Sequence, residues 1–133
     1  MAISTPWQWL LVVLYLIGCQ TVPPLQTLRI GRGSPELAQA RFDPESNSWE
    51  SAPWGTQGGG VKWLPYPART ELEIEHGLDR LPASVLVYIS FREDGTSCAL
   101  AAGDLAIFLH ADEKTIRIAN ATNQSYFARI VLR

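Results

Sequence analysis

The sequence predicts an all-β fold, a small antiparallel β-sandwich or barrel, over residues 68–133. Three observations support this prediction. Apolar and polar residues alternate along five segments of that range, as they do in half-buried strands. Short polar turns separate the segments, and no stretch places its apolar residues at helical spacing. Several strands joined by short connections favour a sandwich or a small barrel.

The first two predicted strands are residues 71–75 and 84–91. In the first, Leu72 and Ile74 alternate with glutamates, so one face is apolar and the other acidic. The second, SVLVYISF, carries apolar residues on both faces, which indicates a central strand. A turn at residues 93–95 ends it.

Three more strands are predicted at residues 105–109, 115–119 and 126–132. A hairpin loop after residue 110 separates the first two, and the polar sequence NATNQS precedes the last. In that last strand Ile130 faces the core, and Arg129 faces out.

Residues 20–67 have a different texture, because Gly and Pro interrupt them too often for long regular elements. We expect residues 19–34 to form a tether and residues 35–67 an irregular flap. A short helix could begin at Pro35, with Ser34 as its cap.

The flap is rich in aromatic residues, which argues against plain disorder. These rings could pack against the strand domain, or they could form a ligand platform, since tryptophan faces stack on sugars and bases. The candidate residues for this aromatic platform are Trp49, Trp54, Trp63 and Tyr66.

The longest apolar run, Trp7–Ile17, lies near the N-terminus. A helix of this length spans about 16 Å, roughly half the hydrocarbon core of a bilayer. The run therefore fits the apolar part of a signal peptide rather than a membrane span. It ends in the sequence LIGC, in which a small residue, Gly18, precedes Cys19.

This LIGC ending resembles the lipobox of bacterial lipoproteins. The resemblance implies that residues 1–18 are a signal peptide, that cleavage follows Gly18, and that Cys19 carries palmitate-type acyl chains. Gln20 stands where that family places Asp in inner-membrane proteins, which implies the cell outer membrane. The alternatives are an ordinary secretory signal with an incidental cysteine, or an uncleaved anchor.

The strand block from Thr70 to Arg133 also resembles the H-type lectin-like sandwich, with HGL followed by proline before SVLVYISF. That resemblance implies sugar binding and trimeric assembly. No sugar-contacting residue of that family can be placed on this sequence.

Residues that carry chemistry are few. The formal net charge of −2 indicates no nucleic-acid partner. His76 and His110 stand outside any metal spacing, and a nucleophilic pair of Cys98 with a histidine has no motif to support it. With Cys19 acylated, we expect the Cys98 thiol to be buried or half-buried. The glutamates of residues 71–75 most simply form a solvated face.

The sequence therefore predicts no catalytic residue, metal or cofactor. We expect a membrane-anchored, non-enzymatic module of the bacterial cell envelope, with a protein partner or a second copy of the chain bound to it. The alternatives are a glycan-binding module and a small exported hydrolase without a visible motif. Exposed sheet edges also predict that residues 68–133 alone are poorly soluble.

Overall fold

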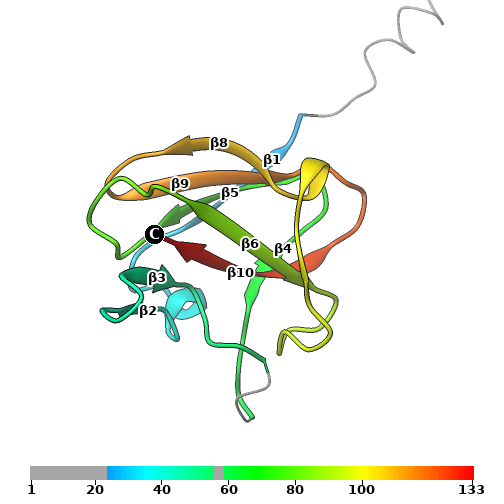
Figure 1. Cartoon of the computed structure of the whole chain (residues 1–133). Helices are drawn as coiled ribbons and strands as arrows, with labels where there is room; N and C mark the ends of the chain where they lie inside the picture. The colour runs from blue at the N-terminus through cyan, green and yellow to red at the C-terminus, as the bar shows by residue number, and fades with distance from the viewer. Residues whose placement is uncertain (1–23, 56–58) are drawn as a thin grey trace, which may run out of the picture.

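The computed structural model describes residues 24–55 and 59–133, which form two facing β-sheets (Figure 1). The elements begin with β1 Gln26–Ile30, the 3-10 helix η1 Pro35–Leu37, β2 Arg41–Asp43, β3 Ser48–Glu50, β4 Leu64–Tyr66, β5 Thr70–Glu75 and β6 Val85–Ser90. They continue with β7 Ala99–Leu100, the 3-10 helix η2 Gly103–Leu105, β8 Ile107–Ala111, β9 Thr115–Asn120 and β10 Tyr126–Leu132. The predicted all-β sandwich is confirmed, and the two sheets do not close into a barrel.

The first sheet has the strand order β1-β5-β9-β8. The pair β1–β5 is parallel, and the other two pairs are antiparallel. Gln26 pairs with Thr70, which in turn pairs with Asn120. Ile107, the first residue of β8, pairs with Ala119. The start of β1 and the start of β8 therefore lie at the same end of this sheet.

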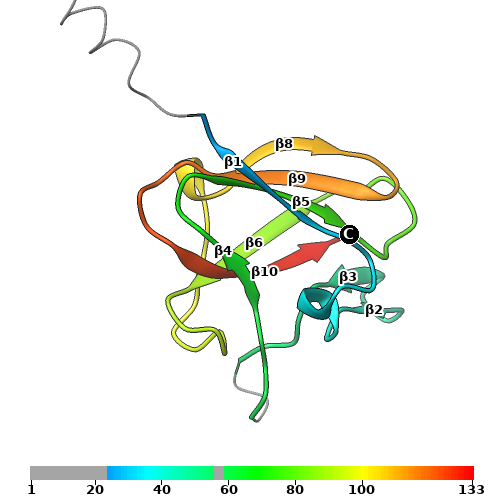
Figure 2. The same cartoon turned by 180° about the vertical axis from the view of Figure 1, so that it is seen from behind.

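The second sheet has the order β2-β3-β10-β6-β7, with all pairs antiparallel. β10 is its central strand. One side of β10 pairs with β6 along six residues. The other side is shared by β4, opposite residues 126–128, and β3, opposite residues 131–132 (Figure 2). β3 and β4 together thus occupy the side of β10 that one long strand would otherwise fill.

The main core fills the space between the two sheets. Alternation along the strands directs every second side chain into this space, which is why Leu72 and Ile74 are fully buried while the glutamates between them are not. The other buried members are Ile30, Leu37, Trp49, Leu64, Tyr66, Leu78, Val87, Ile89, Ile116, Ile118, Ala128, Ile130 and Leu132.

A smaller apolar cluster covers the outer face of the second sheet. Ala52, Val61 and Trp63 are buried there, with Trp54, Tyr88 and Phe127 packed against them. β6 is therefore packed on both faces, and the expected central strand is confirmed, since β6 lies between β10 and β7.

Two N-terminal segments contain more regular structure than the sequence predicts. The expected tether, residues 19–34, includes β1, which adds to the edge of β5 through a parallel ladder. The expected irregular flap, residues 35–67, contributes η1, β2, β3 and β4, and three of these are strands of the second sheet. Strands of three residues are too short to show an alternating pattern, so only their pairing with distant segments defines them.

Candidate functional site: an apolar groove at the open edge of the sandwich

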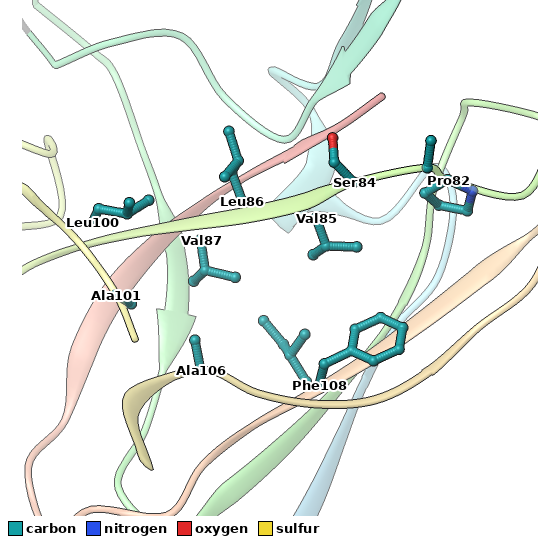
Figure 3. A pocket seen from close by; sticks show the side chains of 11 residues that line it. Pro82, Ser84, Val85, Leu86, Val87, Leu100, Ala101, Ala106 and Phe108 are labelled. Carbon is teal, nitrogen blue, oxygen red and sulfur yellow. The ribbon is translucent and has the colours of Figure 1, made fainter. Parts of the chain in front are cut away.

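A groove of about 330 Å³ opens between the sheets, where β6 and β7 face β8 (Figure 3). Its wall on the second sheet is formed by residues 82–87 and 100–101, and its opposite wall by Ala106, Phe108 and Ile118. Val85 and Val87 point from β6 toward Phe108 and Ala106, whereas Ser84 and Leu86 point away. A volume of this size is at the lower end of the range of small-molecule sites, about 300–1,000 Å³.

The groove exists because this edge of the sandwich is only partly closed. β7 pairs with β6 through just two residues, Leu100 with Tyr88 and Ala99 with Ile89. The chain then crosses to the first sheet through Ala101, whose N–H donates to the Val87 carbonyl (2.8 Å), and through η2. Small side chains along this crossing, including Ala106, leave the space between the sheets unfilled.

The rim of the groove exposes large apolar side chains. Leu100 and Phe108 line it and are 58% and 55% exposed. Leu81 and Leu109, next in sequence to lining residues, are also exposed. Exposed apolar side chains beside an apolar groove are a common feature of interaction sites.

The lining carries no charged side chain, and Ser84 is its only hydroxyl. Such a surface can exclude water from an apolar ligand or side chain. It carries no acidic or basic side chain, and the Ser84 side chain points away from the space. β8 also has an irregular register between Phe108 and His110. Such irregularity at an edge strand weakens the template for pairing with another strand.

The four residues of the aromatic platform do not share a surface. Trp49, Trp63 and Tyr66 are buried, and Trp49 and Tyr66 belong to the main core. The Trp63 indole N–H donates to the Pro53 carbonyl (3.0 Å), and the Tyr66 hydroxyl donates to the Leu105 carbonyl (2.6 Å). A stacking platform needs exposed ring faces, so this arrangement does not form one, and the rings pack against the sandwich instead.

Trp54 is half-buried and covers a cation. The guanidinium of Arg129 lies under the Trp54 ring, 3.8 Å from its centroid, and 5.7 Å from the Tyr88 centroid. Arg129 Nε donates to the Ala52 carbonyl (2.8 Å), and an Nη pairs with Glu50 (3.2 Å). Burial lowers the pKa of Arg129, and the negative charge of Glu50 partly opposes this shift.

The sequence places Arg129 on the outer face of its strand, and it does project from that face, but only 1% of it is exposed. The Trp54 ring lies over its guanidinium, and the Ala52 carbonyl accepts from it. Alternation within one strand cannot reveal a cover supplied by a distant segment. A cation in an otherwise apolar strand, with several tryptophans elsewhere in the chain, is the signal that could have indicated this contact.

The acidic face of β5 is paired rather than free. Glu73 contacts Arg29 of β1 (2.8 Å), and Glu71 contacts Arg117 of β9 (2.8 Å). The Thr27 hydroxyl also donates to Glu71 (3.4 Å). Cross-strand ion pairs thus cover the outer face of the first sheet, consistent with the expected surface role of this row.

His76 is a buried structural residue. Its Nδ1 accepts a hydrogen bond from the Leu78 N–H (3.2 Å), and its Nε2 lies 3.0 Å from the Asp112 carbonyl, to which it donates. These two bonds select the tautomer with hydrogen on Nε2. The ring joins the end of β5 to the β8–β9 turn, a role that goes beyond the turn residue expected from the sequence.

Cys98 is exposed, so the expected buried or half-buried thiol is wrong. It lies in the loop between β6 and β7, which projects from the sandwich. Figures 1 and 2 both place that loop at the opposite end of the sandwich from the β5–β6 and β8–β9 connections. The β5–β6 connection carries His76, and the β8–β9 connection lies next to His110. Among residues 24–55 and 59–133, no group of three or more His, Cys, Asp or Glu side chains could hold a metal ion.

Two further points concern ligands and membranes. A cavity of about 500 Å³ beside η1 is lined by charged residues, including Glu36, Lys62 and Glu93. Its Gln39 amide is already engaged, because it accepts from the Lys62 N–H (2.9 Å) and donates to the Gly60 carbonyl (2.6 Å).

Within the described part of the chain, no helix is long and apolar enough to cross a membrane. Cys19 and the LIGC sequence lie outside the described residues.

Comparison with protein-family models, curated proteins and solved structures found no match to this chain. The resemblances to bacterial lipoproteins and to the H-type lectin-like sandwich therefore stay predictions from the sequence.

Proposed function

We propose that this protein is a lipid-anchored, non-catalytic β-sandwich of the cell envelope that acts as an interaction or assembly module. The observation that carries the proposal is the groove, whose uncharged walls and exposed Leu100 and Phe108 favour apolar contact over catalysis. The LIGC sequence supports the anchor on Cys19, and Gln20 favours the outer membrane.

Other parts of the described surface support the same choice. Two carboxylates of β5, Glu71 and Glu73, are paired with arginines, and the two histidines make contacts that join strands and turns. A glycan-binding role has less support, because three of the four aromatic-platform residues are buried. A hydrolase role has less support, because the groove lining carries no acidic or basic side chain and Ser84 points away from the space.

The anchor is tested by expressing the full chain in a bacterium with two membranes. Intact-mass measurement should show cleavage before Cys19 and an added lipid mass, and the protein should sediment with membranes. Cys19→Ser should release the protein from membranes or prevent its cleavage and lipidation. The control Cys98→Ser should change neither the cleavage and lipidation nor the sedimentation. An unprocessed N-terminus, or a Cys19 without lipid, contradicts the anchor.

The interaction role is tested by formaldehyde crosslinking in the same cells. We expect adducts of higher mass with the wild-type chain, and their loss with Leu100→Asp, which places a charge at the groove rim. Phe42→Asp is the matched control, because Phe42 is exposed but lies on β2, away from the groove. Adducts that resist Leu100→Asp, or that are absent altogether, contradict the role assigned to the groove.

A further inference from the structure

The groove has the chemistry of a site for a hydrocarbon chain. The side chains that line it are aliphatic apart from Phe108 and Ser84, none of them is charged, and the space lies between two sheets and opens to solvent. A hydrocarbon chain needs burial without directional polar contacts, which is what such walls supply.

The N-terminal segment begins close enough to reach it. The chain enters β1 at the end of the first sheet where β8 begins, although β1 and β8 are the two opposite edges of that sheet. From Gln26 to the start of β8 there are three strand spacings of about 4.8 Å, roughly 14 Å. Cys19 precedes Gln26 by seven residues, which can span about 23 Å when extended.

We propose that the groove holds a fatty acyl chain carried by Cys19 of the same molecule whenever the protein is away from a bilayer, and that anchoring in a bilayer empties the groove. The inference rests on the proposed function, because it requires an acylated Cys19. It adds a regulation to that function: the groove is closed to partners while the protein is in transit and opens once the protein is anchored.

The direction of the exchange follows from how much of the chain each environment buries. A bilayer surrounds the whole hydrocarbon chain, whereas the groove is open on one side and shields only part of it. The acyl chain therefore enters the bilayer when one is present, and it enters the groove rather than water when no bilayer is present. Since a single acyl chain binds membranes only marginally and two hold firmly, moving one chain into the groove also weakens the anchor.

The test places a photoreactive side chain in the groove of the full-length, lipidated protein. Phe108→p-benzoylphenylalanine replaces one exposed aromatic ring by another, and the control is the same replacement at Phe42, which is 45% exposed on β2. Each protein is irradiated in two states: after dilution of a nonionic detergent below its micelle concentration, and after reconstitution in phosphatidylethanolamine–phosphatidylglycerol vesicles. Peptide mass spectrometry then locates the crosslinks.

We expect an intrachain crosslink between residue 108 and the acyl group on Cys19 in the diluted protein, at least fivefold weaker in vesicles and weak in the Phe42 variant. No intrachain product, an equal product at residue 42, or an equal product in vesicles overturns the inference. A crosslink to a second copy or to another protein in the diluted state also overturns it, because the groove then has a different occupant. If the intact mass shows no lipid on Cys19, the proposed function itself fails, which is a separate result from a lipidated protein that gives no crosslink.

Discussion

The guanidinium of Arg129 lies 3.8 Å from the centroid of the Trp54 ring and contacts the Glu50 carboxylate at 3.2 Å. This contact fastens the segment after β3 to the outer face of β10. The buried cation is incompletely satisfied, because its other Nη makes no hydrogen bond among the described residues. The hydrogen bond to Ala52, the ion pair with Glu50 and the Trp54 ring must therefore offset the free-energy cost of burying the guanidinium.

Replacing Arg129 should destabilise the fold strongly. Arg129→Ala leaves the Ala52 carbonyl without its partner and leaves Glu50 with Arg41 alone, and we expect a loss of about 3 kcal/mol in the free energy of unfolding, measured with urea. The control is Arg29→Ala, which removes an exposed ion pair with Glu73 and should cost less than about 1 kcal/mol. Equal losses for the two variants would contradict the role given to Arg129.

Two glycines with left-handed backbone should respond differently to alanine. Gly95 has φ +78°, and a Cβ there would collide with the Trp63 ring, while Gly33 has φ +87° and open space around it. Both variants incur the backbone cost of roughly 1–2 kcal/mol, but only Gly95→Ala also displaces a buried indole. Thermal unfolding should show a clearly larger drop in Tm for Gly95→Ala, and similar drops would argue against the packing of Trp63 under this loop.

The Cys98 thiol should react in the folded protein. Because it is exposed in the β6–β7 loop, a thiol reagent such as Ellman's should label it without denaturant. The labelling rate in buffer should be within about tenfold of the rate in urea. A thiol that reacts only after unfolding would contradict its exposed position, and Cys98→Ser should abolish the signal in residues 20–133, which lack Cys19.

Asp112 should stabilise the β8–β9 turn in a pH-dependent way. Hydrogen bonds from the Thr115 and Lys114 N–H groups, and then the contact with His110, hold the pKa of Asp112 well below its ordinary value of 3.8. A carboxylate with a depressed pKa in the folded state stabilises the fold above its unfolded pKa, and this contribution is lost as pH falls through the folded pKa.

The stability difference between wild type and Asp112→Ala should therefore be largest near about pH 6 and should shrink steadily below about pH 4. The control is Glu113→Ala, an exposed neighbour for which little change is expected at either pH. A difference that stays constant down to strongly acidic pH would show that the Asp112 charge contributes nothing to the turn. Urea unfolding at a series of pH values measures it.

Residues 68–133 should not fold as an independent unit. Removing the preceding residues takes β3 and β4 from one side of β10 and removes Trp49, Leu64 and Tyr66 from the core. We expect this fragment to aggregate in size-exclusion chromatography, whereas residues 20–133 remain soluble. A monomeric, folded fragment would mean that the N-terminal strands are dispensable.

β5, β6, β8, β9 and β10 could be predicted because alternation over five or more residues is visible in one segment alone, although β8 begins two residues later than the predicted strand. β1 also has five residues, but from the sequence they are expected to lie in a tether. Leu72 and Ile74 of β5 are an example, since their burial follows from the pattern of their own strand. β2, β3, β4 and β7 are two or three residues long and exist through pairing with distant strands, so no local pattern predicts them. The groove likewise cannot be predicted from one segment, because it is the space between Ala101 on one wall and Ala106 on the other.

Arg129 and Cys98 show a second limit of prediction from the sequence, which concerns the exposure of polar side chains. The exposure of each depends on which segment covers it, and that segment is far away in the chain or absent. The segment that carries Ala52 and Trp54 contacts Arg129, whereas Cys98 is exposed. The burial of a polar residue is thus a property of the assembled layers rather than of its own strand.

The parallel pairing of β1 with β5 has a mechanical consequence for a protein held by its N-terminus. A pull on that terminus along the axis of β1 is directed along the ladder from Gln26–Thr70 to Ile30–Ile74. Such a force shears all five residue pairs together, and the exposed Arg29–Glu73 ion pair lies within the same loaded region. Tension from a membrane would therefore be shared across the whole edge of the first sheet before it reached the core.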